Sequence, residues 1–234
     1  SRCSTGTCTS AAANIFEPAL DVIYEDFWTD VNRAAVNGSI NYLYTDLTHL
    51  DATNNEAPVS TTCLVSWDHL CRIIINYHEH IEPLWSLPRT NPNYDPMDPN
   101  SIQDWTCTSC HSTRDAANAL QIPAGQLNLT NYLLDYPGTF IPNAEQVDTY
   151  RELLFNSIEL DLDMTGTALI DIGTQNPPMT ANGALASVAF FDRFATGDTH
   201  EGRLSGAELR LIAEWLDIGA QYYNNPFDPM APQN

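Results

Sequence analysis

The sequence predicts a mainly α fold, organised as one domain around a cysteine motif in the middle of the chain. Apolar residues recur at intervals of three and four in several stretches, which is the spacing of amphipathic helices. The chain has 234 residues, of which 43% are hydrophobic, so it can bury a core of its own. We expect residues 1–13 to be a linker with a small disulfide and residues 14–234 to be a single domain, with its core at roughly 70–227.

Five stretches have the helical pattern, and the first of them ends at Gly38. The expected helices cover residues 14–36, 67–85, 145–157, 184–194 and 205–218. A capping box of Ser205 and Glu208 opens the last helix, and Gly219 stops it. Residues 40–50 fit either a strand or a helix, and the segments rich in proline and polar residues are expected to be long loops.

The motif Trp105-Thr-Cys107-Thr-Ser-Cys110-His111 carries the strongest functional signal. Cys-x-x-Cys-His is the spacing that attaches a haem to a chain through two thioethers, while the histidine ligates the iron. A zinc site would need a second Cys-x-x-Cys, and a redox dithiol is expected after a buried strand rather than after a proline-rich loop such as residues 88–101. A plain disulfide loop stays open as the alternative. The motif therefore predicts one covalent haem c, with His111 as its proximal ligand.

The second axial ligand decides whether such a haem transfers electrons or binds and transforms other molecules. His200 precedes the capped last helix, Met179 follows two prolines, and His78 lies on the apolar face of the second expected helix. Each also has an ordinary interpretation. His200 could be a plain loop histidine, Met179 a methionine that fills a gap in the core, and His78 a core histidine. The residues alone leave the choice open. Trp105, Met179 and Trp215 are expected to line the haem pocket, and residues 122–129 to cover one haem face as a short strand or turn.

Residues 199–220 resemble the closing helix of a cytochrome c family. That family includes the C-terminal haem domain of the hydrazine synthase alpha subunit and related haem domains of secreted bacterial proteins. The resemblance covers about residues 77–227, and its main segments are Tyr77-His78-Glu-His80-Ile-Glu-Pro83, Pro178-Met179, Phe190-Phe191 and Tyr222 to Phe227. It implies a cytochrome c-like haem domain with an N-terminal helical extension, and it implies His200 as the distal ligand, ahead of Met179 and then His78. Residues 1–70 have no recognised counterpart, and nothing resembles a hydrazine-forming site.

Two imidazole ligands predict a six-coordinate, low-spin haem of comparatively low potential. The expected function is electron transfer without catalysis, with a redox protein such as a secreted copper monooxygenase as the partner. The alternative is a five-coordinate haem, or one with a labile ligand, that acts as a peroxidase or as a sensor of diatomic gases. A peroxidase would require a distal arginine or acid, and the sequence alone places no such group near the haem.

The charge of the chain restricts its partners. Nine arginines, no lysine and 30 acidic residues give a formal net charge of −21. Such a chain is repelled by nucleic acid and by anionic membranes, and no apolar run approaches the roughly 18 residues of a membrane span. Because it lacks a ring of lysines, we expect its partner to offer a basic or apolar surface.

The other cysteines indicate where the protein works. Cys3, Cys8, Cys63 and Cys71 allow three pairings, and we expect the two short-range bridges, Cys3 to Cys8 and Cys63 to Cys71. Haem attachment and disulfides together predict a periplasmic, cell-surface or secreted protein. No signal peptide is present, and the absence of an initiator methionine at Ser1 leads us to expect a processed protein or an excised domain.

Calcium is a further cofactor to consider. Asp95, Asp98 and Asn100 are close in sequence, and Asp161-Leu-Asp163-Met-Thr165-Gly166 begins like an EF-hand loop. Neither segment is complete: the first lacks a central glycine and a terminal glutamate, and Ile172 stands where the second needs its bidentate carboxylate.

Overall fold

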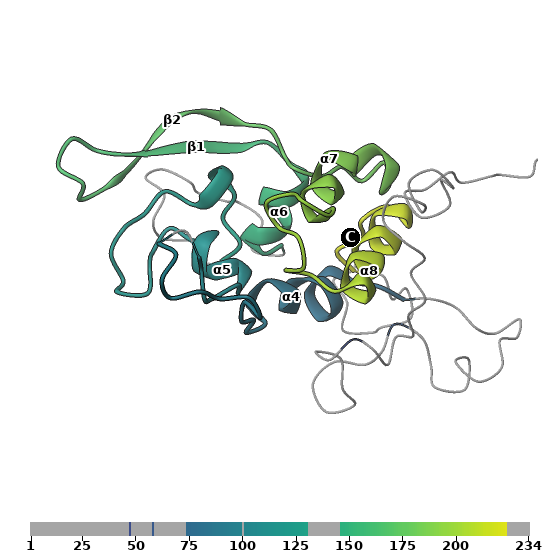
Figure 1. Cartoon of the computed structure of the whole chain (residues 1–234). Helices are drawn as coiled ribbons and strands as arrows, with labels where there is room; N and C mark the ends of the chain where they lie inside the picture. The colour runs from purple at the N-terminus through teal and green to yellow at the C-terminus, as the bar shows by residue number, and fades with distance from the viewer. Residues whose placement is uncertain (1–46, 48–57, 59–73, 100, 131–145, 224–234) are drawn as a thin grey trace, which may run out of the picture.

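The structure is a computed structural model in which residues 47, 58, 74–99, 101–130 and 146–223 are described. Of this part, 34% is helical and 12% is strand, with one antiparallel sheet of two strands. The prediction of a mainly α fold is therefore wrong, and the described part is a mixed α/β structure. Figure 1 shows the two strands on one side of the molecule and the helices α4, α6, α7 and α8 gathered on the other.

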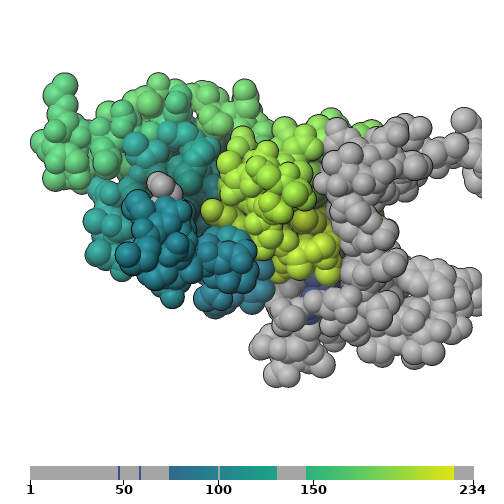
Figure 2. Space-filling model, in the orientation of Figure 1, coloured from purple at the N-terminus to yellow at the C-terminus, as the bar shows by residue number. Residues whose placement is uncertain are grey.

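The strands form a hairpin that the sequence analysis missed. Strand β1 (Ser157–Leu162) pairs with β2 (Leu169–Gln175) in antiparallel register, with Leu162 opposite Leu169. Apolar and acidic residues alternate along β1, which is the period of a strand. The hairpin extends away from the helices at the left edge of the molecule (Figures 1 and 2).

The turn of this hairpin contains the residues that resemble the start of an EF-hand. The Asp163 carboxylate accepts hydrogen bonds from the backbone N–H groups of Thr167 (2.7 Å) and Ala168 (3.1 Å). A hydrogen bond from the Thr165 hydroxyl, and next these backbone bonds, lower the pKa of Asp163. Gly166 has φ +68°, which a turn requires and which glycine adopts without strain. Asp163 therefore stabilises the turn by accepting hydrogen bonds from backbone N–H groups of the turn itself.

The helices differ from the predicted ones mainly in length. The described part of the second expected helix is the π-helical turn η2 (Tyr77–Ile81) followed by α4 (Glu82–Ser86). The third is the shorter α6 (Asp148–Leu154). The fourth is divided into η4 (Leu185–Ser187), α7 (Val188–Phe191) and η5 (Asp192–Phe194). It is interrupted at Ser187, whose hydroxyl donates a hydrogen bond to the carbonyl oxygen of Gly183 (3.1 Å).

The last helix, α8 (Gly206–Asp217), begins with the predicted capping box and ends before Gly219, as predicted. The Glu208 N–H donates to the Ser205 hydroxyl (3.2 Å), and the Ser205 N–H donates to the Glu208 carboxylate (2.7 Å), which completes the capping box. Gly219 has φ +93°, as expected at the end of a helix. The buried apolar residues of the helix are Ala207, Leu211, Ile212, Ala213, Trp215 and Leu216. None of the described helices is long and apolar enough to cross a membrane.

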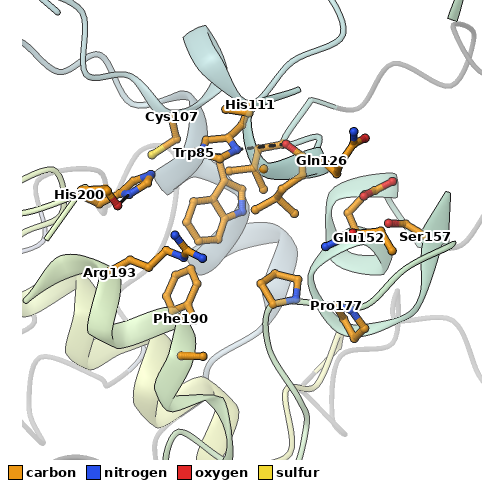
Figure 3. Close-up of a pocket in the computed structure, with 18 of the residues that line it drawn as sticks. Trp85, Cys107, His111, Gln126, Glu152, Ser157, Pro177, Phe190, Arg193 and His200 are labelled. Carbon is orange, nitrogen blue, oxygen red and sulfur yellow. Dashed lines mark hydrogen bonds between the residues drawn. The ribbon is translucent and has the colours of Figure 1, made fainter. Parts of the chain in front are cut away.

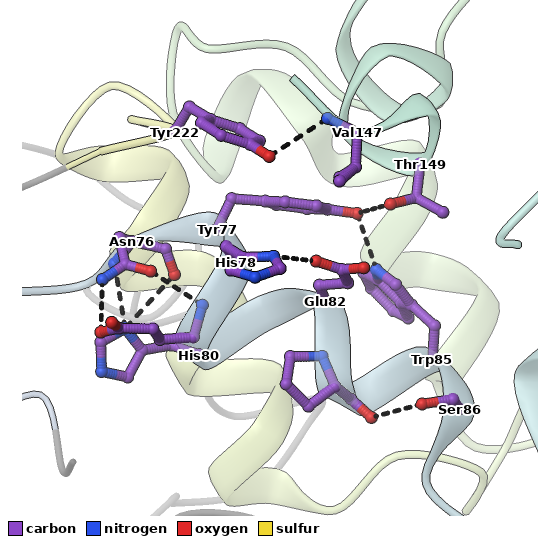
Figure 4. Close-up of polar contacts among 12 residues, drawn as sticks. Asn76, Tyr77, His78, His80, Glu82, Trp85, Ser86, Val147, Thr149 and Tyr222 are labelled. Carbon is purple, nitrogen blue, oxygen red and sulfur yellow. Dashed lines mark hydrogen bonds and ion pairs between the residues drawn. The ribbon is translucent and has the colours of Figure 1, made fainter. Parts of the chain in front are cut away.

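An aromatic cluster joins α8 to η2 and α6. The Tyr77 ring lies 5.4 Å from that of Trp215 and 5.2 Å from that of Tyr150. The Tyr77 hydroxyl donates to Thr149 (2.7 Å) and accepts from the indole N–H of Trp85 (3.0 Å), as Figure 4 shows. Tyr77, Trp85 and Thr149 are all buried, so water cannot replace either hydrogen bond.

We expect Tyr77→Phe to lower the free energy of unfolding by about 1–3 kcal/mol, because it leaves the buried Trp85 N–H without its acceptor. Urea denaturation of the two proteins measures the difference. The control is Tyr94→Phe, since Tyr94 is 40% exposed and its hydroxyl can reach water. Equal losses in the two variants would contradict this role for Tyr77.

Several expectations concern residues outside the described part. These are the helix at 14–36, the segment 40–50 except Leu47, the linker at 1–13 and both disulfides.

Candidate functional site

The cysteine motif forms a short helical turn that follows a long loop. Helix α5 (Cys107–Cys110) is closed by a hydrogen bond from the His111 N–H to the Cys107 carbonyl (2.9 Å). The described part of residues 88–101 contains no helix, as predicted. The Trp105 N–H donates to the Arg89 carbonyl (3.0 Å), which ties the two ends of the loop together.

A partly buried ion pair holds this loop against α8. The Arg89 guanidinium donates two hydrogen bonds to the Glu208 carboxylate, at 2.7 and 3.0 Å. This bidentate arrangement fixes both orientation and distance. Because Glu208 also closes the capping box, the start of α8 and the cysteine motif share one anchor.

His111 is held in place through its ring nitrogen Nδ1. Its Nδ1 lies 3.2 Å from the carbonyl oxygen of Leu127, and a carbonyl can only accept, so Nδ1 carries the proton. Nε2 then carries no proton, and its free electron pair can bind a metal ion. Burial lowers the pKa of His111, so the ring stays neutral at neutral pH.

His200 is also held through Nδ1. Its Nδ1 is hydrogen-bonded to the Thr199 hydroxyl (2.8 Å), which in turn lies 3.1 Å from the Asp198 carboxylate. Burial and, next, the Arg203 charge lower the pKa of His200 to about 4. The backbone N–H of His200 donates to the Arg193 carbonyl (2.8 Å), which fixes this loop on η5.

The two imidazoles lie at one end of a cavity of about 450 Å³ (Figure 3). That volume is within the range of roughly 300–1,000 Å³ that is usual for cofactor sites. Its apolar wall includes Trp85, Leu127, Leu129, Pro177, Phe190 and Phe194. The turn η3 (Ala124–Gln126) also lines it, so residues 122–129 contribute to the cavity as a turn.

The distance between the imidazoles fits one metal ion. Their ring centres are 5.9 Å apart, with 31° between the ring planes. A bond from a metal to imidazole nitrogen is about 2 Å long and the ring centre lies about 1 Å behind the nitrogen, so two axial imidazoles place their ring centres about 6 Å apart. The Cys107 thiol lines the same cavity. These donors fit a haem iron held by His111 and His200.

The other predicted site residues lie elsewhere. Cys110 is half-buried on α5, with its sulfur 3.9 Å from the Ser109 hydroxyl, and is not among the residues that line the cavity. Trp105 does not line the cavity either, and the guanidinium of Arg203 lies 5.8 Å from the centre of its ring. Met179 and Trp215 are buried in the hydrophobic core and do not line the cavity. His78 is exposed and bonds to Glu82.

The described residues contain no group of three histidine, cysteine or acidic side chains arranged for a metal ion. Asp95 is used in a local turn, where its carboxylate accepts from the Met97 N–H (2.8 Å). Asn100, the third residue of that calcium prediction, lies outside the described part.

The cavity is also lined by three charged side chains that the sequence analysis did not identify: Arg193, Arg203 and Glu152. Burial raises the pKa of Glu152 to about 7, and its hydrogen bond with Ser157 opposes the shift. A sequence signal for this part of the cavity wall did exist. It is the aromatic stretch directly before the His200 loop, Phe190-Phe191-Asp192-Arg193-Phe194.

Glu152 should make the stability of the protein depend on pH. Its folded pKa of about 7 is above the ordinary 4.5, so its contribution is fully present below pH 4.5 and is lost as the pH rises through about 7. We expect this fall to be about 3 kcal/mol in the wild type and absent in Glu152→Gln. Urea denaturation at a series of pH values measures it. Glu79→Gln, which changes an exposed carboxyl, is the control and should keep the wild-type profile.

No family model, curated protein or solved structure matches this chain. The resemblance to the cytochrome c family therefore stays a prediction, and the argument for function depends on the geometry of the site.

Proposed function

We propose that this protein transfers single electrons through one covalently attached haem c, with His111 and His200 as the axial ligands of the iron. The observation that carries the proposal is the 5.9 Å separation of two neutral imidazoles beside a cavity lined by Cys107. When bound, the haem supplies a one-electron couple between ferric and ferrous iron. Cys107 and Cys110 supply the thiols for its two thioethers.

Each group of the protein has a role in this function. The Leu127 carbonyl orients His111, and the Thr199–Asp198 pair orients His200, so that both present Nε2. The aromatic wall of Trp85, Phe190 and Phe194 keeps water from the iron site. With both axial positions filled, the protein has no open site for a substrate, so we expect electron transfer and not catalysis.

The partners follow from the chemistry and the charge. A redox protein must supply or accept the electron, and a secreted copper monooxygenase is our candidate acceptor. The net charge of −21 favours a partner with a basic surface. Thioether haem places the protein in the periplasm, on the cell surface or outside the cell.

One observation favours the second candidate, a peroxidase or gas sensor. Arg193 and Arg203 line the cavity near His200, which supplies the distal cation that such a function requires. The two functions differ in whether His200 stays bound to the iron.

Visible spectra of the ferric and ferrous protein, with and without carbon monoxide, separate them. We expect a low-spin, six-coordinate spectrum that lacks the band of a thioether-to-iron bond and does not change with carbon monoxide. A high-spin spectrum that changes at once on adding carbon monoxide would support the second candidate instead.

A further inference from the structure

Positive side chains outnumber negative ones in the cavity wall, whereas acidic residues predominate in the whole chain. The chain has 30 acidic residues against nine arginines, yet two arginines and one acid line the cavity. That acid is Glu152, whose pKa is raised to about 7 by burial. A cavity wall of this kind attracts an anionic group.

Arg203 already has a partner in the protein. Its guanidinium lies 5.8 Å from the centre of the Trp105 ring, in position for a cation–π interaction. Trp105 is two residues before Cys107, so Arg203 is at the edge of the cavity where the thiol lies.

Arg193 has no such partner. Within the described residues, its guanidinium forms no hydrogen bond or ion pair at contact distance with an acidic side chain. Figure 3 shows the side chain entering the cavity from the side of Phe190, across from the helix that carries Cys107.

We propose that Arg193 binds a propionate carboxylate of the haem, an inference that rests on the proposed function. A haem joined to the chain at Cys107 and Cys110 would direct its carboxylates away from these sulfurs and into the cavity. Of the two arginines that line the cavity, Arg193 is the one without a partner among the described residues. Arginine suits this role because its planar guanidinium matches a carboxylate with two parallel hydrogen bonds. The backbone bond from His200 to the Arg193 carbonyl (2.8 Å) would also connect the propionate contact to the ligand loop.

The test compares four matured holoproteins: wild type, Arg193→Gln, Arg203→Gln and Arg210→Gln. The readouts are the propionate-bending band of the resonance Raman spectrum and the midpoint potential as a function of pH. Arg193→Gln should shift the band, lower the potential and move its pH dependence to higher pH, since loss of the cation favours ferric iron and raises the pKa of the propionate. Arg203→Gln should lower the potential without shifting the band. Arg210, which pairs with Glu214 on α8, is the control and should change neither.

Several results would overturn the inference. One is an unshifted band in Arg193→Gln; another is an equal shift in Arg203→Gln. A band that is the same in the wild type and in Arg193→Gln, together with binding of inorganic phosphate that Arg193→Gln loses, would show that Arg193 binds a free anion and not the haem carboxylate. Arg193→Lys, which keeps the charge, should retain the wild-type potential more closely than Arg193→Gln and serves if the latter does not mature. A wild-type protein without covalent haem would overturn the proposed function as well.

Discussion

Replacing Cys107 and Cys110 together with alanine should remove all covalently attached haem from the protein. Each of the two thioether bonds needs one of these sulfurs, and the described part of the chain contains no other cysteine. The measurement is haem absorbance that remains with the polypeptide after denaturation and organic extraction. We expect full retention in the wild type and none in the double variant.

Ser109→Ala is the matched control for this change, because Ser109 lies between the two cysteines and its hydroxyl bonds to the Thr106 carbonyl (2.7 Å). It should keep the haem. Single Cys→Ala variants should retain one thioether, with a shifted ferrous absorption band. Covalent haem that persists in the double variant would show that the attachment site has been misidentified.

Replacing His200 with alanine should convert a closed iron site into an open one. The second imidazole is lost and no described side chain is placed to replace it, because Met179 is buried in the core and His78 is exposed and bonded to Glu82. We expect carbon monoxide binding to the ferrous protein to change from undetectable to one per haem, with a ferric spectrum that changes from low to high spin.

Two variants separate this result from a general disturbance. Met179→Leu preserves the volume of a core side chain, and His78→Ala removes an exposed one, so both should keep the wild-type spectrum. If Met179→Leu alone opened the site, methionine would be the distal ligand and His200 would be a loop residue.

Local chemistry made part of the structure predictable. The capping box of Ser205 and Glu208 depends on residues three apart, and so does the turn from Cys107 to Cys110. The position of His200 ahead of α8 follows from the sequence, and the resemblance implied its pairing with His111; the two rings lie 5.9 Å apart. These features are set by residues close together in the sequence or by a specific motif.

The parts that were missed depend on contacts between distant residues. The alternation along β1 is short, and the acidic residues that precede its turn were interpreted as a partial calcium loop. Met179, which follows two prolines, has the pattern of a ligand, but it packs in the core and its N–H donates to the Leu153 carbonyl (3.1 Å). Trp85 and Phe190 have the spacing of core residues, and only the folded chain shows that they face a cavity.

The pairing of Arg89 with Glu208 shows why the cavity has its shape. These residues are 119 positions apart, and their ion pair sets the distance between the cysteine turn and the start of α8. The sequence gives no local signal for such a pair, since both residues would ordinarily be assigned to the surface.

The most direct test is the intact mass of the wild-type protein, matured in a cell with a haem-attachment system and measured after denaturation. The account predicts the mass of the polypeptide plus one haem. The mass of the bare polypeptide would contradict it.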